Sequence, residues 1–427
     1  MTAPILFRGG RVVDPSQGLD EVSDLLVLDG TIAAIGRNIG TPDGAQVIDA
    51  AGWIIAPGLI DVHVHLREPG QEERETIATG AASAVAGGFT GICAMPNTDP
   101  VIDNQSAVGF VKSRGEAAGL ARVFPIGCIS VGQKGERLAE FGEMVAAGAV
   151  AVSDDGHPVM SSQLMRTALE YARTFDIPVA DHCEDTPLAI GGAMHEGIVA
   201  TRLGLKGIPS AAEEIHVARD CILAGLTGGH VHLCHMSTRG SVDLIRRAKE
   251  QGLSVTAEAA PHHYTLTHER VGDYDTNAKM NPPLREDADR AAIRAALADG
   301  TIDCIATDHA PHTYDAKERE FDDAPNGIIG LETALSLGLR ELVQGGVLTL
   351  PTLIERMSCA PARLWHLPGG TLRVGGVADI VAFDPLAQWT VDPARIRSRS
   401  RNTPWAGETL PGVVRMTLVG GRVVFAA

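Results

Sequence analysis

Eight short apolar segments alternate with amphipathic helical stretches through the middle of this 427-residue chain. Patterns typical of helices lie between them, as at residues 75–86, 161–174, 211–226 and 241–251. Eight repeats of strand and then helix predict an α/β fold, a closed (β/α)8 barrel of the TIM type. The predicted strands are residues 53–65, 90–95, 122–129, 149–153, 177–181, 230–233, 254–259 and 302–306.

Both ends of the chain carry short strand patterns separated by turn residues, as at 24–28 and 31–35 near the start and 378–383 and 413–419 near the end. Either group alone is too thin to form a stable sheet. We therefore expect one small β-sandwich domain built from both termini. The predicted units are residues 1–54 and 367–427 for the sandwich and residues 55–366 for the barrel.

Most polar residues of chemical interest fall where a predicted strand ends. In a (β/α)8 barrel the carboxyl ends of all strands face one another around a single site. The remaining histidines singled out, at 195, 216, 268 and 366, are expected on the surface or in packing contacts. The strand-end set is His63, His65, Asn97, Asp154, Asp155, His182, His235, His262, His263, Asp308 and His312.

This set predicts a metal site. His63 and His65 are two residues apart in a strand and point the same way, and converging imidazoles suit zinc. With His182, His235, Asp308 and one carboxylate from Asp154 or Asp155, the chain offers enough ligands for two ions that share a bridge. Zinc is favoured, manganese or cobalt would also fit, and a single zinc is the simpler alternative.

Two ligand choices stay open at this point. The spacing alone does not separate Asp154 from Asp155. His232 and His235 have opposite strand parity, so only one can point into the barrel, and His235 is preferred because it lies at the very end of its strand.

The chemistry expected of this site is metal-assisted hydrolysis. Two cations would lower the pKa of a shared water and polarise a carbonyl. Asp308 follows the last strand and is placed to take the proton of that water and return it to a leaving nitrogen. Arg67 is a permanently charged planar fork, suited to a substrate carboxylate.

Composition excludes several other classes of function. The net charge of −17 argues against a nucleic-acid partner. The seven cysteines are odd in number and scattered, which fits reduced core thiols rather than a disulfide framework. No signal-peptide pattern or apolar run of membrane-spanning length is present, so a cytoplasmic location is expected.

Several motifs together give the chain a resemblance to the type I dihydroorotases of the amidohydrolase superfamily. The resemblance extends over essentially the whole chain, including Asn402-Thr403-Pro404. The motifs are Asp-Val-His-Val-His-Leu-Arg-Glu-Pro-Gly at 61–70, Met-Pro-Asn-Thr at 95–98, Asn-Pro-Pro-Leu-Arg at 281–285, Asp-His-Ala-Pro-His at 308–312 and Gly-Ile-Ile-Gly-Leu-Glu-Thr at 327–333.

The resemblance implies reversible cyclisation of N-carbamoyl-L-aspartate to L-dihydroorotate in pyrimidine biosynthesis. By position, the family's metal ligands match His63, His65, Asp155, His182, His235 and Asp308, with Asp308 also the acid/base. Arg67, Asn97 and His312 match residues that hold the substrate carboxylate, and Asn281, Asn326 and Gly327 match contacts to the ring. Aspartate carbamoyltransferase and a second copy of the chain are possible partners.

One departure from the wider superfamily concerns the metal bridge. Hydantoinases and allantoinases use a carboxylated lysine at the end of the fourth strand, where this chain has Asp154 and Asp155 and no lysine. An aspartate bridge is expected instead, and alignment by eye favours Asp155. The alternatives are another cyclic amidohydrolase of the dihydropyrimidinase or allantoinase type, and a non-catalytic scaffold for aspartate carbamoyltransferase. The charged loop between His312 and Gly327 is a plausible lid.

Overall fold

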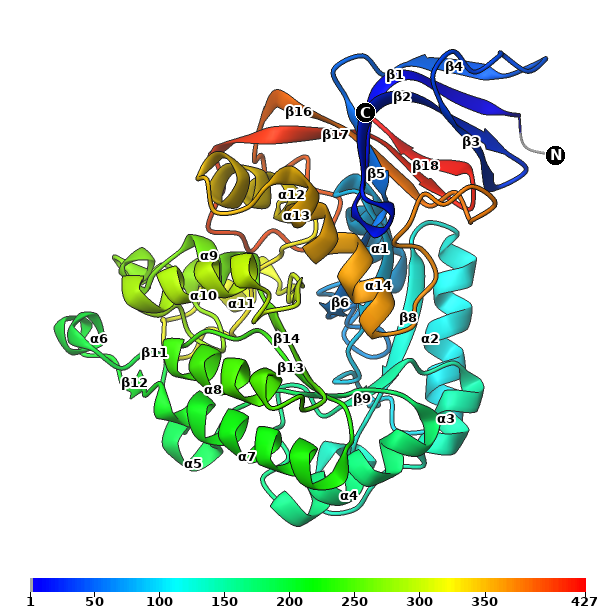
Figure 1. Ribbon diagram of the computed structural model, residues 1–427. Helices are drawn as coiled ribbons and strands as arrows, with labels where there is room; N and C mark the ends of the chain where they lie inside the picture. Colours follow the sequence, from blue (N-terminus) through cyan, green and yellow to red (C-terminus); the bar gives the residue numbers. More distant parts are fainter. Residues whose placement is uncertain (1–2) are drawn as a thin grey trace.

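The computed structural model describes residues 3–427 and contains the predicted parallel barrel (Figure 1). Its eight strands are hydrogen-bonded in chain order, and the barrel closes where the His65 amide donates to the His309 carbonyl at 2.9 Å. The predicted fold class is confirmed. The strands are β6 (Leu59–Val64), β7 (Phe89–Ala94), β8 (Arg122–Gly127), β9 (Ala151–Ser153), β10 (Val179–Asp181), β13 (Val231–Leu233), β14 (Val255–Ala259) and β15 (Cys304–Ile305).

Helices surround these strands, and polar caps fix where several of them begin. The Asn104 side chain, for example, accepts hydrogen bonds from the amides of Ser106 and Ala107 at the start of the second helix. The outer helices are α1 (Ile77–Ala86), α2 (Gln105–Ala118), α3 (Phe141–Ala147), α4 (Ser162–Ala172), α7 (Ala211–Thr227), α8 (Arg239–Glu250) and α10 (Asp287–Asp299). Short helices on the connecting loops are α9 (Pro261–Thr265) and α11 (Tyr314–Lys317).

Two stretches depart from a plain strand–helix repeat. After β15 the outer layer is built from α12 (Ala334–Leu337), α13 (Leu350–Ile354) and α14 (Ala360–Leu364), joined by π-helical turns at Gly338–Gln344 and Glu355–Cys359. Between β10 and α7 the chain makes an excursion through α5 (Thr186–Ala189), β11 (Met194–His195), α6 (Ile198–Leu203) and β12 (Gly207–Ile208). Elements this short carry too little periodicity to be predicted from sequence.

The two ends of the chain form one mixed sheet with strand order β18-β17-β16-β5-β1-β2-β3, and β4 pairs with β1. The sheet curves back on itself, since the Ile32 amide donates to the Gly376 carbonyl at 2.9 Å. The described strands are β1 (Ile5–Asp14), β2 (Leu19–Leu28), β3 (Thr31–Gly36), β4 (Gln46–Asp49), β5 (Ile54–Pro57), β16 (Ile380–Thr390), β17 (Thr409–Val419) and β18 (Arg422–Ala426).

The core of this sheet joins residues from both termini, with Phe7 and Leu25 packed in one cluster with Ile380 and Leu418. Neither end could bury its apolar face without the other. β5 belongs to this sheet and leads within two residues into β6 of the barrel. The proposed unit boundaries at residues 54 and 366 remain a prediction.

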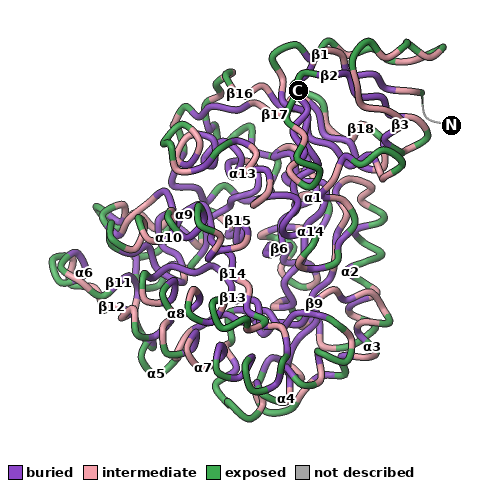
Figure 2. Tube along the Cα trace, in the orientation of Figure 1, coloured by how far each residue is buried: buried purple, intermediate pink, exposed green. Residues whose placement is uncertain are grey.

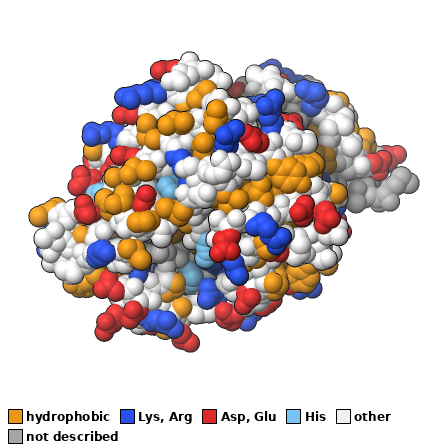
Figure 3. All heavy atoms as spheres, turned by 90° about the horizontal axis from the view of Figure 1, so that it is seen from below, with side chains coloured by type: hydrophobic (Ala, Val, Ile, Leu, Met, Phe, Trp, Pro, Cys, Tyr) orange, Lys and Arg blue, Asp and Glu red, His pale blue; other side chains and the backbone are white. Residues whose placement is uncertain are grey.

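Burial follows the barrel strands, as Figure 2 shows. The barrel floor is a small apolar cluster that includes Ile60, Val62 and Ile126. The seven cysteines are all free and buried, as predicted for core thiols. On the face drawn in Figure 3, acidic and basic side chains are interspersed. Within residues 3–427, no helix is both long and apolar enough to cross a membrane.

Candidate active site

The carboxyl ends of the barrel strands enclose a cavity of about 260 Å³. Its lining includes every predicted site residue except His63 and Gly327, together with Gly156, Met280 and Ala310. His63 lies on β6 and is fully buried, whereas Gly327 lies behind His312. We call the residues of the predicted metal site the histidine–aspartate cluster, or the cluster: His63, His65, Asp155, His182, His235 and Asp308. The structure therefore brings the predicted residues together from seven different strand ends and loops.

Asp155 is at the centre of the cluster. Its Oδ1 lies 3.4 Å from His63 Nε2 and 3.5 Å from both His182 Nδ1 and His235 Nε2. Its Oδ2 lies 3.4 Å from His65 Nε2. A carboxylate that faces four imidazoles with both oxygens has the arrangement needed to bridge two cations.

Asp308 completes the cluster from the end of β15. Its Oδ1 lies 3.1 Å from His65 Nε2 and 3.5 Å from His63 Nε2. Asp308 has φ 47° and His235 has φ 39°, in the left-handed region that non-glycine residues rarely adopt. Such backbone conformations concentrate at functional sites, where the surrounding structure enforces them.

The structure also shows which way the side chains point in the two pairs that the sequence did not distinguish, Asp154 with Asp155 and His232 with His235. Asp154 points away from the cluster and accepts hydrogen bonds from the amides of Ile129 (2.8 Å) and Ser130 (3.1 Å). His232 points to the barrel floor, where its Nε2 lies 3.1 Å from Glu258 Oε2. Of each pair, only Asp155 and His235 reach the cavity.

The donor set fits a metal ion. His63 Nε2 and Asp155 Oδ1 are buried and have no hydrogen-bond partner, although both face the cluster. Burial opposes a charged His63, but Glu258, Asp155 and Asp308 outweigh it and raise the pKa of His63 well above its usual value. The cluster thus attracts positive charge into a space lined by imidazole and carboxylate, the ligands that zinc prefers.

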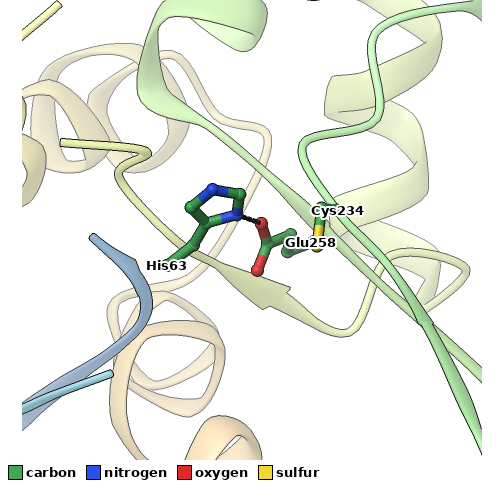
Figure 4. Close-up of side chains that lie close together, drawn as sticks. All are labelled: His63, Cys234 and Glu258. Carbon is green, nitrogen blue, oxygen red and sulfur yellow. Dashed lines mark hydrogen bonds and ion pairs between the residues drawn. The ribbon is translucent and has the colours of Figure 1, made fainter. Parts of the chain in front are cut away.

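Glu258, on β14, supports this cluster and was not singled out from the sequence. Its Oε1 lies 2.7 Å from His63 Nδ1 and accepts the His235 amide at 3.1 Å. Figure 4 shows its carboxylate against the His63 ring, with Cys234 beside it. The signal that could have found it is a glutamate between two alanines near the end of a mostly apolar strand.

Arg67 also lines the cavity and has only 8% of its surface exposed. Its Nε donates to the Pro311 carbonyl at 3.2 Å, and its NH2 lies 3.4 Å from His312 Nε2. His312 Nε2 donates to the Asn326 carbonyl at 2.8 Å and therefore carries a hydrogen. It cannot also accept a hydrogen bond from Arg67, so the two side chains are in contact without a hydrogen bond between them. Burial lowers the pKa of Arg67 to about 10, which leaves it charged at neutral pH.

The partners of Arg67 are neutral. Burial and the neighbouring guanidinium lower the pKa of His312 to about 2, so its imidazole carries no charge. Hydrogen bonds from the buried guanidinium therefore reach a carbonyl and not a carboxylate. Asp308, Asp155 and Glu75 favour the charged form of Arg67, but no carboxylate among residues 3–427 forms an ion pair with it. An anionic group that paired with Arg67 in the cavity would offset the cost of burying its charge.

The amides predicted to contact substrate have protein partners as well. Asn97 Oδ1 lies 2.8 Å from His65 Nδ1, and Asn97 Nδ2 donates to the Asp155 carbonyl at 3.2 Å. Asn281 Nδ2 lies 3.3 Å from His182 Nε2, while its buried Oδ1 has no partner. Both side chains line the cavity and orient histidines of the cluster.

Other expectations concern residues outside the cavity. His195, His216 and His268 are buried packing residues, and His366 is exposed. His262 and His263 are buried behind the cavity, with His263 Nε2 2.9 Å from the Pro282 carbonyl. In the predicted lid, Lys317 is buried, with its ammonium group 2.9 Å from the Pro325 carbonyl.

Comparison with known proteins identifies the family to which this chain belongs. A family model described as dihydro-orotase-like matches residues 52–241, and an amidohydrolase family model matches residues 223–425. The chain is 56% identical over 421 residues to a dihydroorotase of Pelobacter propionicus, covering 99% of each protein. The chain belongs to the dihydroorotase family. A dihydroorotase of Anaeromyxobacter dehalogenans is 55% identical over 426 residues, covering 99% of this chain and 98% of that relative.

Solved structures show that this dihydroorotase-family fold is shared with other cyclic amidohydrolases. An L-hydantoinase (dihydropyrimidinase) from Arthrobacter aurescens matches with a TM-score of 0.88 at 26% identity, covering 99% of this chain and 96% of that one. A D-hydantoinase (dihydropyrimidinase) from Thermus sp. gives 0.83 at 25% identity, with 99% and 96% covered. Because the fold is common to both activities, the substrate must be argued from the side chains of the site.

Proposed function

We propose that this protein is a dihydroorotase that catalyses the reversible, metal-dependent cyclisation of N-carbamoyl-L-aspartate to L-dihydroorotate. The observation that carries the proposal is the buried Arg67 guanidinium, which shares one cavity with the histidine–aspartate cluster. Within residues 3–427 its hydrogen-bond acceptor is the neutral carbonyl of Pro311. The full-length relatives named dihydroorotase support the same reaction.

The proposed cofactor is a pair of zinc ions. The residues that would hold them are His63, His65, Asp155, His182, His235 and Asp308, with Asp155 as the shared ligand because both of its oxygens face imidazoles. When bound, zinc would polarise the amide carbonyl of the substrate and lower the pKa of water.

The side chains of this chain would divide the remaining work. Arg67 would bind the substrate carboxylate, and the ring would lie in the same cavity against Asn281 and Asn326. The Asp308 carboxylate would accept a proton from water in the hydrolytic direction and deliver it to the ring nitrogen that leaves. In the cyclising direction Asp308 would move the proton the opposite way.

Two features argue against a hydantoinase or dihydropyrimidinase activity. Cyclic substrates of that type lack the carboxylate that a buried Arg67 would pair with. The described cavity lining also contains no lysine that could be carboxylated, and Asp155 lies at the end of the fourth barrel strand instead. The presence of all six proposed ligand side chains close to one another argues against a purely structural scaffold. A homodimer and an association with aspartate carbamoyltransferase in the cytoplasm remain proposals.

A substrate panel tests this assignment. Zinc-loaded protein should hydrolyse L-dihydroorotate and should act much less on dihydrouracil, hydantoin and allantoin, which offer no carboxylate to Arg67. Preferential turnover of dihydrouracil or hydantoin would replace the proposed activity with that of the rival class.

A further inference from the structure

Asn402 lies outside the barrel, on the segment between β16 and β17, yet its side chain reaches the loops that line the active-site cavity. It is buried, with 3% of its surface exposed. Its Oδ1 accepts the His312 amide at 3.1 Å, and its Nδ2 donates to the carbonyls of Ala310 (2.9 Å) and Gly327 (3.0 Å). Both hydrogens of the amide group and its oxygen are therefore engaged.

These three bonds join two separate loops. Ala310 and His312 belong to the loop after β15, and Gly327 belongs to the segment that follows the α11 loop. The two loops run side by side, since Ala310 donates its amide to the Ile328 carbonyl at 2.9 Å. They pack so closely that a Cβ at Gly327 would lie 2.4 Å from the Ala310 carbonyl oxygen. Asn402 spans this junction.

The two joined loops form the part of the cavity wall that contacts Arg67. Arg67 donates to the Pro311 carbonyl, and His312 donates to the Asn326 carbonyl. Ala310, His312 and Asn326 all line the cavity. A shift between the two loops would therefore move the groups around the guanidinium, while the histidines at the other strand ends would keep their places.

Asn402 is itself held in position by the barrel. Glu75 Oε1 accepts the Arg399 amide at 3.0 Å, and Glu332 Oε1 accepts the Arg397 amide at 2.8 Å. Asn402 also accepts the Ile329 amide through its own carbonyl at 3.0 Å. The C-terminal segment is thus anchored on the buried carboxylate of Glu75 and the half-buried carboxylate of Glu332 before it reaches the junction.

We infer that Asn402 is a positioning residue that sets the geometry of the substrate-carboxylate side of the site from outside the barrel. The inference rests on the proposed function for its kinetic readout. Asparagine suits this place because one planar group supplies two donors and an acceptor. Aspartate has the same shape but would set an oxygen against two carbonyl oxygens.

The test compares Asn402→Asp and Asn402→Ala with the wild-type holoenzyme. We expect the KM for L-dihydroorotate to rise roughly tenfold or more with a smaller change in kcat, because binding of the carboxylate is disturbed more than the chemistry. Bound metal should stay at the wild-type level. Asn104→Asp is the matched control, since Asn104 caps α2 through its side-chain oxygen and is not among the residues that line the cavity.

Amide hydrogen exchange gives a readout that needs no substrate. The amides of Ala310, His312 and residues 327–329 should exchange faster in Asn402→Asp, and those of β6 and β10 should not. Inactive wild-type protein would refute the proposed function but would leave this readout to decide the role of Asn402. The inference is overturned if either folded variant retains the wild-type KM and exchange rates, or if only thermal stability falls. If Asn402→Asp does not fold, the same measurements on Asn402→Ala decide the result.

Discussion

Oε1 of Glu258 lies 2.7 Å from Nδ1 of His63, on the side of the imidazole ring away from Asp155 and Asp308. The same oxygen accepts the backbone amide of His235. One carboxylate thus fixes the orientation of one proposed ligand and the backbone of another. Partners of this kind set the tautomer and direction of metal-binding histidines.

Replacing Glu258 should weaken metal binding without removing a proposed ligand. In Glu258→Gln, the side-chain amide has one oxygen in place of the two carboxylate oxygens that contact His63 Nδ1 and His232 Nε2. Its NH2 group would therefore face one of the two imidazoles, and that contact would be lost. We expect metal affinity to fall roughly 10- to 100-fold, measured by competition with a chelator. Glu250→Gln, an exposed change at the end of α8, is the control. Unchanged affinity would show that Glu258 does not orient the ligands.

Arg67→Met should impair L-dihydroorotate turnover while leaving bound metal unchanged. Loss of a buried charged contact commonly costs about 2–5 kcal/mol, so kcat/KM should fall at least roughly thirtyfold. Arg246→Met removes a partly exposed arginine on α8, outside the cavity, and serves as the control. Wild-type kinetics for Arg67→Met would contradict the substrate assignment.

Asp155→Ala and Asp154→Ala form a matched pair of neighbours. Loss of Asp155 should release metal, because its oxygens face the imidazoles that would hold both ions. Loss of Asp154 should leave metal in place but cost roughly 1–3 kcal/mol of stability, because the amides of Ile129 and Ser130 would lose their acceptor. Metal analysis and denaturant unfolding separate the two results, and metal loss from Asp154→Ala alone would reverse the assignment.

The barrel and the place of its site follow from short apolar runs that each end in polar residues. The choice between Asp154 and Asp155 does not, because β9 ends at Ser153 and both residues lie beyond the strand. Alternation of side chains fixes direction only within a strand. Long-range hydrogen bonds decide which way the Asp154 side chain points, as in its bond with the amide of Ile129, 25 residues earlier.

The parts that sequence patterns missed depend on contacts between distant segments. Glu258 meets His63 across 195 residues, and Asn402 meets His312 across 90. Lys317 is part of the charged loop interpreted as a lid, and the fold buries it with its ammonium group against the Pro325 carbonyl. Local propensity contains no information about any of these pairings.

Reconstitution should not require bicarbonate. Carboxylated lysine forms from carbon dioxide, whereas here a carboxylate already lies at the end of the fourth barrel strand in Asp155. Apoprotein should regain full activity with zinc alone in bicarbonate-free buffer. A requirement for bicarbonate would mean that a modified lysine, and not Asp155, joins the ions.

The most direct test of the account measures bound metal and L-dihydroorotate hydrolysis on the same purified sample. The account predicts two zinc ions per chain, activity that is lost on chelation, and activity that returns in proportion to the zinc restored. Hydrolysis by metal-free protein, or a fully zinc-loaded protein that does not act on L-dihydroorotate, would contradict it.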